Sequence, residues 1–202
     1  MFVKPNKIIR WLFPSLIWKG QEKKEKTVWL TFDDGPHPLA TPLILSILKK
    51  KKIKATFFLI GKEIERFPKL FAEIKKQGHT VANHSYSHNN GWITTSYAYI
   101  KDFNKCQEKM PENILFRPPY GKITFTQIKK LEKYKLILWD ILSMDFSEKN
   151  PEKVKKNVIS NLENGSIIVF HNNKKSIPNI EKKLEEIIDD IINRGFKFSA
   201  IW

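Results

Sequence analysis

The sequence has one cysteine, four arginines and no long apolar run, and each shortage excludes a class of structure or site. Cys106 alone allows neither an intramolecular disulfide nor a zinc site built from several cysteines. No apolar stretch approaches the roughly 20 residues that a membrane-spanning helix needs. The chain has 202 residues, of which 41% are hydrophobic. It can therefore bury the core of one domain, and wholesale disorder is excluded.

The net charge is strongly basic, and lysine carries most of it. The 36 Lys and Arg residues against 21 Asp and Glu residues give +15. Lysine lacks the planar fork with which arginine holds phosphates, so we expect no nucleic-acid partner. We interpret most of the excess as lysines on solvated faces. Weak association with an anionic envelope or membrane surface is the alternative.

Residues 1–26 differ from the rest of the chain because apolar and basic residues are mixed there. Arg10 and Pro14 interrupt the apolar stretch, and residues 19–21 do not resemble a cleavage site, so we expect no signal peptide. We expect the segment to pack on a domain of residues 27–202. An interfacial membrane anchor is the alternative role for this segment. The expected location of the protein is the cytoplasm, or association with the inner membrane. The apolar residues are Ile8, Ile9, Trp11, Leu12, Phe13, Leu16, Ile17 and Trp18.

The remaining sequence alternates between strand and helix patterns. Seven short runs are rich in β-branched and aromatic residues, and longer segments with apolar residues at helical spacing separate them. This alternation predicts an α/β fold with a parallel sheet, either closed into a barrel or open and doubly wound. The seven runs are Thr27–Phe32, Ala55–Ile60, Thr80–Asn83, Asn113–Phe116, Leu136–Trp139, Ser166–Phe170 and Lys197–Ile201.

Polar residues directly follow four of these predicted strands. In parallel α/β barrels, functional residues gather where strands end and loops begin. We therefore expect the four groups to share one rim of the sheet. They are Asp33 with Asp34, His84 with His88, Arg117 with Tyr120, and His171.

Two of these groups together predict a divalent-metal site. His84 and His88 are four residues apart, a spacing that in one helical turn lets two imidazoles bind one ion. The adjacent carboxylates of Asp33 and Asp34 repel each other unless a cation or an arginine compensates them. Two histidines and one carboxylate leave ligand positions open, as a catalytic metal requires. We expect Zn²⁺, with Co²⁺, Ni²⁺ or Mn²⁺ as alternatives.

Five motifs in this order resemble those of the polysaccharide deacetylase family, carbohydrate esterase family 4. They are Thr31–Gly35, His84–His88, Arg117–Gly121, the region of Asp145, and Ile168–His171, and the resemblance covers residues 27–202. It implies a distorted, incomplete (β/α) barrel with about seven parallel strands. It also implies a metal-dependent hydrolase that removes acetyl groups from N-acetylated sugars, as in chitin oligomers or peptidoglycan.

The resemblance also implies the roles of individual residues. Asp33 resembles the general base, which Arg117 orients, and His171 resembles the general acid, which Asp145 supports. The residues that resemble the metal ligands are Asp34, His84 and His88. The positions near the oxyanion and the acetyl methyl group are Tyr120, through its backbone N–H, Phe146 and Val169.

This chain departs from the family pattern at two places beside the expected pocket. Residues 142–146 lack the first Asp and the Trp of the usual Asp-x-x-Asp-Trp motif, and Val169 replaces a usual Leu. These changes keep the pocket apolar but alter its shape. Trp92, close after His88, either stacks on a sugar or packs in the core. His37 is expected to be a loop residue near the site, and His79 and Cys106 to be structural.

Three hypotheses about function stay open at this stage. The first is a sugar N-deacetylase, expected to act as a monomer on an acetylated carbohydrate polymer or oligomer. The second is an esterase that removes O-acetyl groups, as on xylan. The third is a carbohydrate-binding protein without catalytic activity on the same fold. The presence of all the residues that resemble catalytic groups argues against the third.

Overall fold

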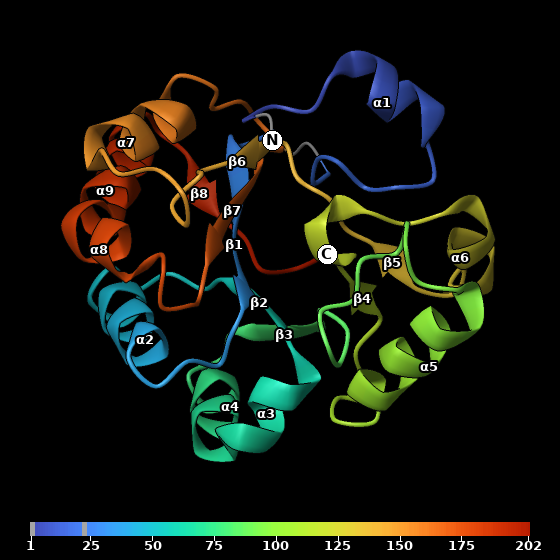
Figure 1. Ribbon diagram of the computed structural model, residues 1–202. Helices are drawn as coiled ribbons and strands as arrows, with labels where there is room; N and C mark the ends of the chain where they lie inside the picture. Colours follow the sequence, from blue (N-terminus) through green and yellow to red (C-terminus); the bar gives the residue numbers. More distant parts are fainter. Residues whose placement is uncertain (1–2, 22–23) are drawn as a thin grey trace.

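A curled parallel sheet forms the centre of the molecule. The computed structural model describes residues 3–21 and 24–202. Within that part of the chain, seven strands follow one another in the order β5-β4-β3-β2-β1-β7-β6, and β8 pairs beside β1. The sheet curls through half a barrel with helices around it (Figure 1). The strands are β1 (Thr27–Asp34), β2 (Thr56–Leu59), β3 (Thr80–Asn83), β4 (Leu115–Phe116), β5 (Lys135–Leu136), β6 (Ile141–Leu142), β7 (Ile167–His171) and β8 (Lys197–Phe198).

The incomplete α/β barrel expected from the sequence is confirmed, and one strand was missed. Strand β6 pairs in parallel with β7 but is only two residues long. Its apolar residues, Ile141 and Leu142, stand between Asp140 and Ser143. The run is therefore too short to show the apolar pattern that identifies a strand.

Helices lie around the sheet (Figure 1). They are α1 (Lys7–Leu12), α2 (Ala40–Lys50), α3 (Gly61–Arg66), α4 (Pro68–Lys76), α5 (Ser96–Gln107), α6 (Phe125–Lys130), α7 (Pro151–Ile159), α8 (Ile177–Asn179) and α9 (Glu185–Asn193). A π-helical stretch, η2 (Ile180–Leu184), joins α8 to α9, and a single 3₁₀ turn, η1 (Pro119–Gly121), follows β4.

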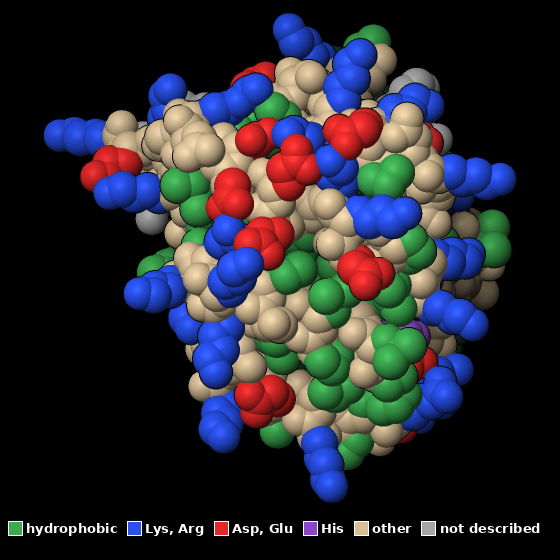
Figure 2. Space-filling model, turned by 90° about the vertical axis from the view of Figure 1, so that its left-hand side faces the viewer, with side chains coloured by type: hydrophobic (Ala, Val, Ile, Leu, Met, Phe, Trp, Pro, Cys, Tyr) green, Lys and Arg blue, Asp and Glu red, His purple; other side chains and the backbone are tan. Residues whose placement is uncertain are grey.

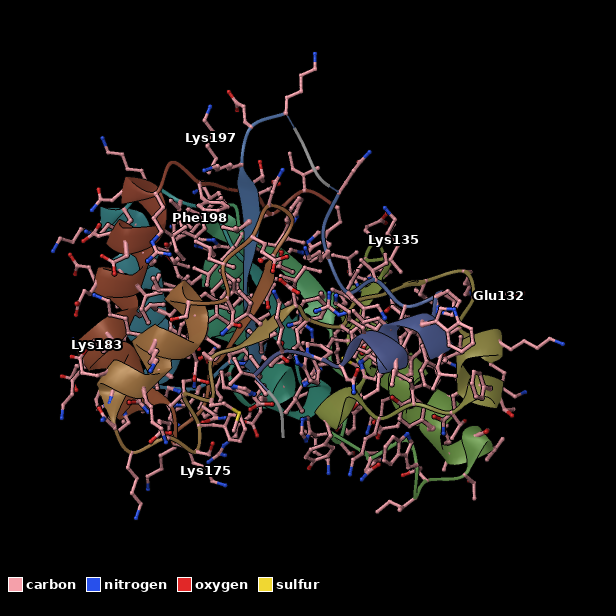
Figure 3. The ribbon with its side chains drawn as sticks, turned by 90° about the horizontal axis from the view of Figure 1, so that it is seen from above. Glu132, Lys135, Lys175, Lys183, Lys197 and Phe198 are labelled. Atoms are coloured by element: carbon pink, nitrogen blue, oxygen red, sulfur yellow. The ribbon has the colours of Figure 1, made fainter. Side chains whose placement is uncertain are left out.

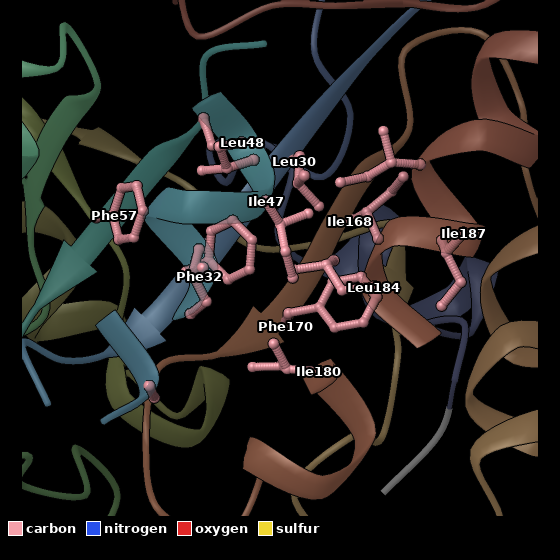
Figure 4. Close-up of a cluster of buried hydrophobic side chains, with 14 of the residues drawn as sticks. Leu30, Phe32, Ile47, Leu48, Phe57, Ile168, Phe170, Ile180, Leu184 and Ile187 are labelled. Carbon is pink, nitrogen blue, oxygen red and sulfur yellow. The ribbon is translucent and has the colours of Figure 1, made fainter. Parts of the chain in front are cut away.

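Alternation along β1 separates the core from the site. Leu30 and Phe32 belong to the buried cluster that packs against the helices, and Figure 4 shows them beside Phe170 and Leu184. Trp29 belongs to a different buried cluster. Successive side chains of a strand point to opposite faces. Thr31 and Asp33 therefore share the face of Trp29, inside the half barrel.

The strand register brings the carboxyl ends of the strands together. Asp33 is opposite Phe58 on β2 and opposite His171 on β7. Asn83 at the end of β3 is opposite Leu59 at the end of β2 and Phe116 at the end of β4. The residues that follow β1, β3, β4 and β7 therefore emerge at one rim, as the sequence predicted.

Part of the N-terminal segment contacts the sheet directly. The backbone of Ile17 pairs with that of Leu136 at 2.8 Å and that of Leu138 at 2.7 Å. Gly20 donates to the carbonyl of Gly165 at 2.8 Å. The side chains of this segment that pack on buried clusters are Val3, Phe13, Leu16, Ile17 and Trp18.

Helix α1 departs from the packing expected of the apolar residues in this segment. Arg10 is directed inward and donates to the fully buried carboxylate of Asp140 at 2.5 Å. Because Arg10 takes the inward side of this six-residue helix, the apolar side chains around it face solvent, and Trp11 is 78% exposed. The other exposed ones are Ile8, Ile9 and Leu12.

Lysines and carboxylates intermingle on the face formed by α2, α7, α8 and α9 (Figure 2). Lys51 contacts Asp189 at 2.7 Å, and Lys155 contacts Glu186 at 2.5 Å and Asp190 at 2.8 Å. Exposed pairs of this kind contribute about 0–1 kcal/mol each. Many lysines thus lie on a solvated face, as predicted. Among the described residues, no helix has the length and apolar character to cross a bilayer.

Candidate active site

A cleft of about 280 Å³ opens at the rim where these strands end. Its walls come from loops after β1, β3, β4 and β7 and from the region of β6. Charged and titratable side chains line one part of the cleft, and apolar side chains line another. The lining residues are Asp33, Asp34, His84, His88, Pro118, Tyr120, Gly121, Trp139, Leu142, Phe146, Val169, His171, Asn173 and Lys175.

Asp34, His84 and His88 come together in the cleft as a candidate metal site. One ligand atom from each lies within 4.8 Å of the others. Asp34 Oδ1 is 3.8 Å from Nε2 of His84 and 3.4 Å from Nε2 of His88. Burial alone would raise the pKa of the Asp34 carboxyl, but the neighbouring histidines His171, His84 and His88 lower it below its usual value. The carboxylate is thus ionised and able to bind a cation.

The protonation of the two imidazoles suits metal binding. His84 Nδ1 lies 2.7 Å from the backbone carbonyl of Arg117. A carbonyl can only accept, so Nδ1 carries a proton and Nε2 is the nitrogen that remains to bind a metal. Burial and, to a smaller extent, the nearby His84 lower the pKa of His88 to about 4. His88 is therefore neutral at pH 7, and these residues fit a divalent ion.

The loop that carries the two histidines is not helical, in contrast to the helical turn assumed from their spacing. Ser85 and His88 have φ values of 63° and 59°. The Asn83 amide oxygen accepts from Ser85 N–H at 2.7 Å, and the Ser85 hydroxyl accepts from His88 N–H at 2.9 Å. The carboxylate of Asp102 on α5 accepts from the backbone N–H groups of Tyr86 at 2.9 Å and Ser87 at 3.0 Å. Side chains thus shape this loop.

Arg117 forms a buried ion pair with Asp33. Its Nη1 donates to Asp33 Oδ1 at 2.6 Å and to the Thr31 hydroxyl at 2.8 Å. Nε and Nη2 donate to the carbonyls of Ile137 and Leu138. The arginine is fully buried, and these bonds fix its position. It therefore holds the Asp33 carboxylate in one orientation while Asp33 Oδ2 lies 3.9 Å from His84 Nε2.

His171 is paired with Asp145 on the opposite side of the cleft. His171 Nδ1 lies 2.8 Å from Asp145 Oδ1, and the His171 backbone N–H donates to Oδ2 at 2.8 Å. The Ser143 hydroxyl donates to the same carboxylate at 2.9 Å. Burial would lower the pKa of His171, but the charge and hydrogen bond of Asp145 raise it to about 9. His171 is therefore protonated at neutral pH, with Nε2 left for the cleft.

Three further residues of the predicted site line the cleft. Tyr120 has a φ of 60° and lies with its ring centre 4.5 Å from that of His88. The Phe146 ring stands edge-on to His171 at 4.5 Å. Val169, at 1% exposure, is part of the apolar wall.

Trp92 does not line the cleft. Its side chain is 62% exposed, so it does not pack in the core. The Lys122 ammonium lies 5.0 Å from its ring centre. His37 accepts backbone N–H bonds from Leu39 and Ala40 at the start of α2. His79 and Cys106 are buried structural residues, as expected.

Left-handed backbone conformations concentrate at this rim. Within residues 3–21 and 24–202, six non-glycine residues have positive φ, and all of them except Lys52 belong to segments at this rim. Such conformations cost of order 1–3 kcal/mol each and persist where the surrounding structure holds them. The other five are Asp34, Ser85, His88, Tyr120 and Met144.

Four further residues that support the site were not predicted from the sequence. Asn83 and Asp102 shape the histidine loop, and Thr31 contacts Arg117. The Asn173 amide donates to Asp34 Oδ2 at 2.6 Å. Asn83 and Thr31 adjoin recognisable motifs, and this adjacency was a usable signal. Asp102 stands in an ordinary amphipathic helix, where nothing in the sequence distinguishes it.

Known proteins resemble this chain over almost its full length. A peptidoglycan N-acetylglucosamine deacetylase of Bacillus cereus is 30% identical over 207 residues, which cover 98% of this chain and 93% of the relative. The peptidoglycan N-acetylmuramic acid deacetylase PdaC of Bacillus subtilis is 29% identical over 185 residues, which cover 89% of this chain and 39% of that protein.

A solved structure and a family profile agree with these relatives. The crystal structure of the Bc1960 peptidoglycan N-acetylglucosamine deacetylase, in complex with 4-naphthalen-1-yl-N-oxidanyl-benzamide, superposes with a TM-score of 0.84 at 29% identity. The match covers 94% of this chain and 92% of that one. The profile of the family described as polysaccharide deacetylase matches residues 20–138. The chain therefore belongs to the polysaccharide deacetylase family, carbohydrate esterase family 4.

Proposed function

We propose that this enzyme removes acetyl groups from N-acetylated sugars of peptidoglycan with the help of one divalent metal ion. One observation carries the proposal: three residues that could hold a metal ion share one cleft with two ion pairs. The trio is Asp34, His84 and His88. The pairs are Asp33 with Arg117 and His171 with Asp145. The named relatives act on peptidoglycan, which supports this substrate class.

Asp34, His84 and His88 are the proposed ligands. What a divalent ion supplies there is polarisation of the acetyl carbonyl and a lowered pKa of bound water. An aspartate and two histidines suit Zn²⁺, and the same set also accepts Co²⁺, Ni²⁺ or Mn²⁺.

The chain's own residues supply the proton transfers. Asp33, held by Arg117, accepts a proton as water attacks the acetyl carbon. His171, protonated at neutral pH, donates a proton from Nε2 to the sugar nitrogen as the C–N bond breaks, and acetate and the amine are released. The backbone N–H of Tyr120 is the proposed donor to the oxyanion. Phe146 and Val169 surround the methyl group.

Acetate release tests the proposal. The wild-type enzyme is incubated with N-acetylglucosamine oligomers, peptidoglycan and O-acetylated xylan, before and after treatment with a chelator. We expect acetate from the first two substrates, loss of activity after chelation and recovery with Zn²⁺. Asp33→Asn is the inactive control. Release from xylan alone would favour the esterase, and release from none would favour a binding protein without activity.

A further inference from the structure

The two oxygens of the Asp34 carboxylate have different neighbours. Oδ2 accepts from the Asn173 amide at 2.6 Å. Oδ1 faces Nε2 of His88 at 3.4 Å and Nε2 of His84 at 3.8 Å. We propose that Asn173 is a positioning residue that occupies Oδ2, so that Asp34 offers Oδ1 alone to the metal. This inference rests on the metal site of the proposed function.

Hydrogen bonds within the segment decide the orientation of the Asn173 amide. Its Oδ1 accepts the backbone N–H groups of Lys175 at 2.9 Å and Ser176 at 3.2 Å. Both partners are donors, so the oxygen must face them and the amino group must face Asp34. If the amide were flipped, its amino group would face the two backbone N–H donors, and its oxygen would face the Asp34 carboxylate.

The backbone around Asn173 is tied to the strands that carry the site. Asn172 N–H donates to the carbonyl of Asp33 at 2.7 Å. The buried Ser176 hydroxyl bonds to the carbonyls of His171 and, at 2.9 Å, Asn173. The amide is therefore presented from a fixed turn between β7 and α8.

Adjacent carboxylates thus receive chemically different partners. Asp33 is paired with the cation Arg117 at 2.6 Å, whereas Asp34 receives a neutral amide. A cation at Asp34 would compete with a metal ion for the negative charge. An amide fixes the carboxylate and leaves its charge for the metal, as expected of a group that orients a ligand. Asp34 has a φ of 84°, and the amide adds a tertiary contact that holds this disfavoured conformation.

Zn²⁺ affinity of the metal-free full chain, measured by competition with a chromophoric chelator, tests the role of Asn173. In Asn173→Ser the hydroxyl can still accept backbone N–H groups of the turn but is too short to reach Asp34. We expect this variant to bind Zn²⁺ about 10–100-fold more weakly. We also expect the visible absorption of the Co²⁺-loaded protein to change, because Asp34 Oδ2 becomes free to coordinate.

Two controls make the result specific. Lys174→Ala changes an exposed neighbour in the same turn and should bind Zn²⁺ as the wild type does. Asp34→Asn should abolish binding. Wild-type Zn²⁺ affinity in Asn173→Ser would show that the role proposed for Asn173 is wrong. Loss of binding in Asp34→Asn in the same experiment would still support the metal site. A wild-type chain that does not bind Zn²⁺ would contradict both.

Discussion

Arg117 and Asp33 form a buried ion pair at 2.6 Å, although 84 residues separate them in the sequence. The pair distinguishes Asp33 from its neighbour Asp34, which faces two histidines instead. A charge already paired with arginine is poorly suited to bind a metal. The geometry thus agrees with the assignment of Asp33 as base and Asp34 as ligand.

This distinction predicts opposite metal contents for two conservative variants. Asp33→Asn should keep the metal and lose about 10²–10⁴ in kcat, the usual contribution of a positioned base. Asp34→Asn should lose both metal and activity. Elemental analysis and acetate release measure the two effects. A metal-free Asp33→Asn variant that still folds would show that the roles are reversed.

The histidine loop gives a second prediction. His84→Ala and His88→Ala should each weaken metal binding strongly, because each removes one of three proposed ligands. His37→Ala is the matched control, since its ring nitrogen accepts bonds from the start of α2. Full metal content in the double variant His84→Ala, His88→Ala would contradict the site.

Much of this site could be predicted from sequence because its reacting groups occupy ordered motifs at strand ends. The strand pattern predicted that Asp33, His84, Arg117 and His171 share one rim, and the family resemblance supplied the role proposed for each. Asn173 could not be identified in this way, since its partner Asp34 is 139 residues away. Such a contact depends on the register of β1 and β7, and residue types do not reveal it.

The errors in the fold have similar local causes. A two-residue strand such as β6 carries no periodicity, so Ile141–Leu142 was missed. The apolar residues near the N-terminus were expected to pack on the domain, but in α1 the inward position belongs to Arg10, which pairs with the buried carboxylate of Asp140. A buried charge that pairs with a distant residue can thus override an apolar pattern.

The Arg10–Asp140 contact predicts a loss of stability that does not involve the site. Asp140 is fully buried, and Arg10→Ala removes its nearest described cation. Among the described residues, Asp140 then keeps the more distant Lys4 at 4.0 Å and the Ser166 hydroxyl at 2.7 Å. We expect the free energy of unfolding to fall by about 3 kcal/mol. Urea denaturation measures it, with the exposed Lys7→Ala as control. Equal stabilities would show that this pair contributes nothing.

The position of Lys175 predicts that the enzyme prefers acidic glycans. It lines the cleft, and Figure 3 shows it at the periphery of the molecule. N-Acetylmuramic acid carries a carboxylate that an N-acetylglucosamine oligomer lacks. Lys175→Gln should therefore lower kcat/KM about threefold for muramic-acid-containing fragments, as for an exposed ion pair, and leave neutral oligomers unaffected. Lys174→Gln is the control, and equal losses on both substrates would exclude a role in selectivity.

The last prediction concerns the pH dependence set by Asp145 and His171. Asp145 raises the pKa of His171 to about 9 against the lowering effect of burial. The acid form is therefore complete at neutral pH and is lost as the pH rises through 9. Asp145→Asn removes the charge and keeps the shape. The pKa of His171 should then fall, with Asp34 and Asp33 as the carboxylates that still raise it, and the alkaline limb of kcat/KM should move to lower pH.

The leaving group provides an independent check on this assignment. An activated acetyl ester has a leaving group that needs little protonation, so His171→Ala should slow its hydrolysis far less than that of an N-acetyl sugar. Metal content should be unchanged in both variants, because neither residue belongs to the trio of Asp34, His84 and His88. An alkaline limb unmoved by Asp145→Asn would mean that another group sets it. If His171→Ala slowed hydrolysis of the ester and of the N-acetyl sugar equally, His171 would not be the proton donor.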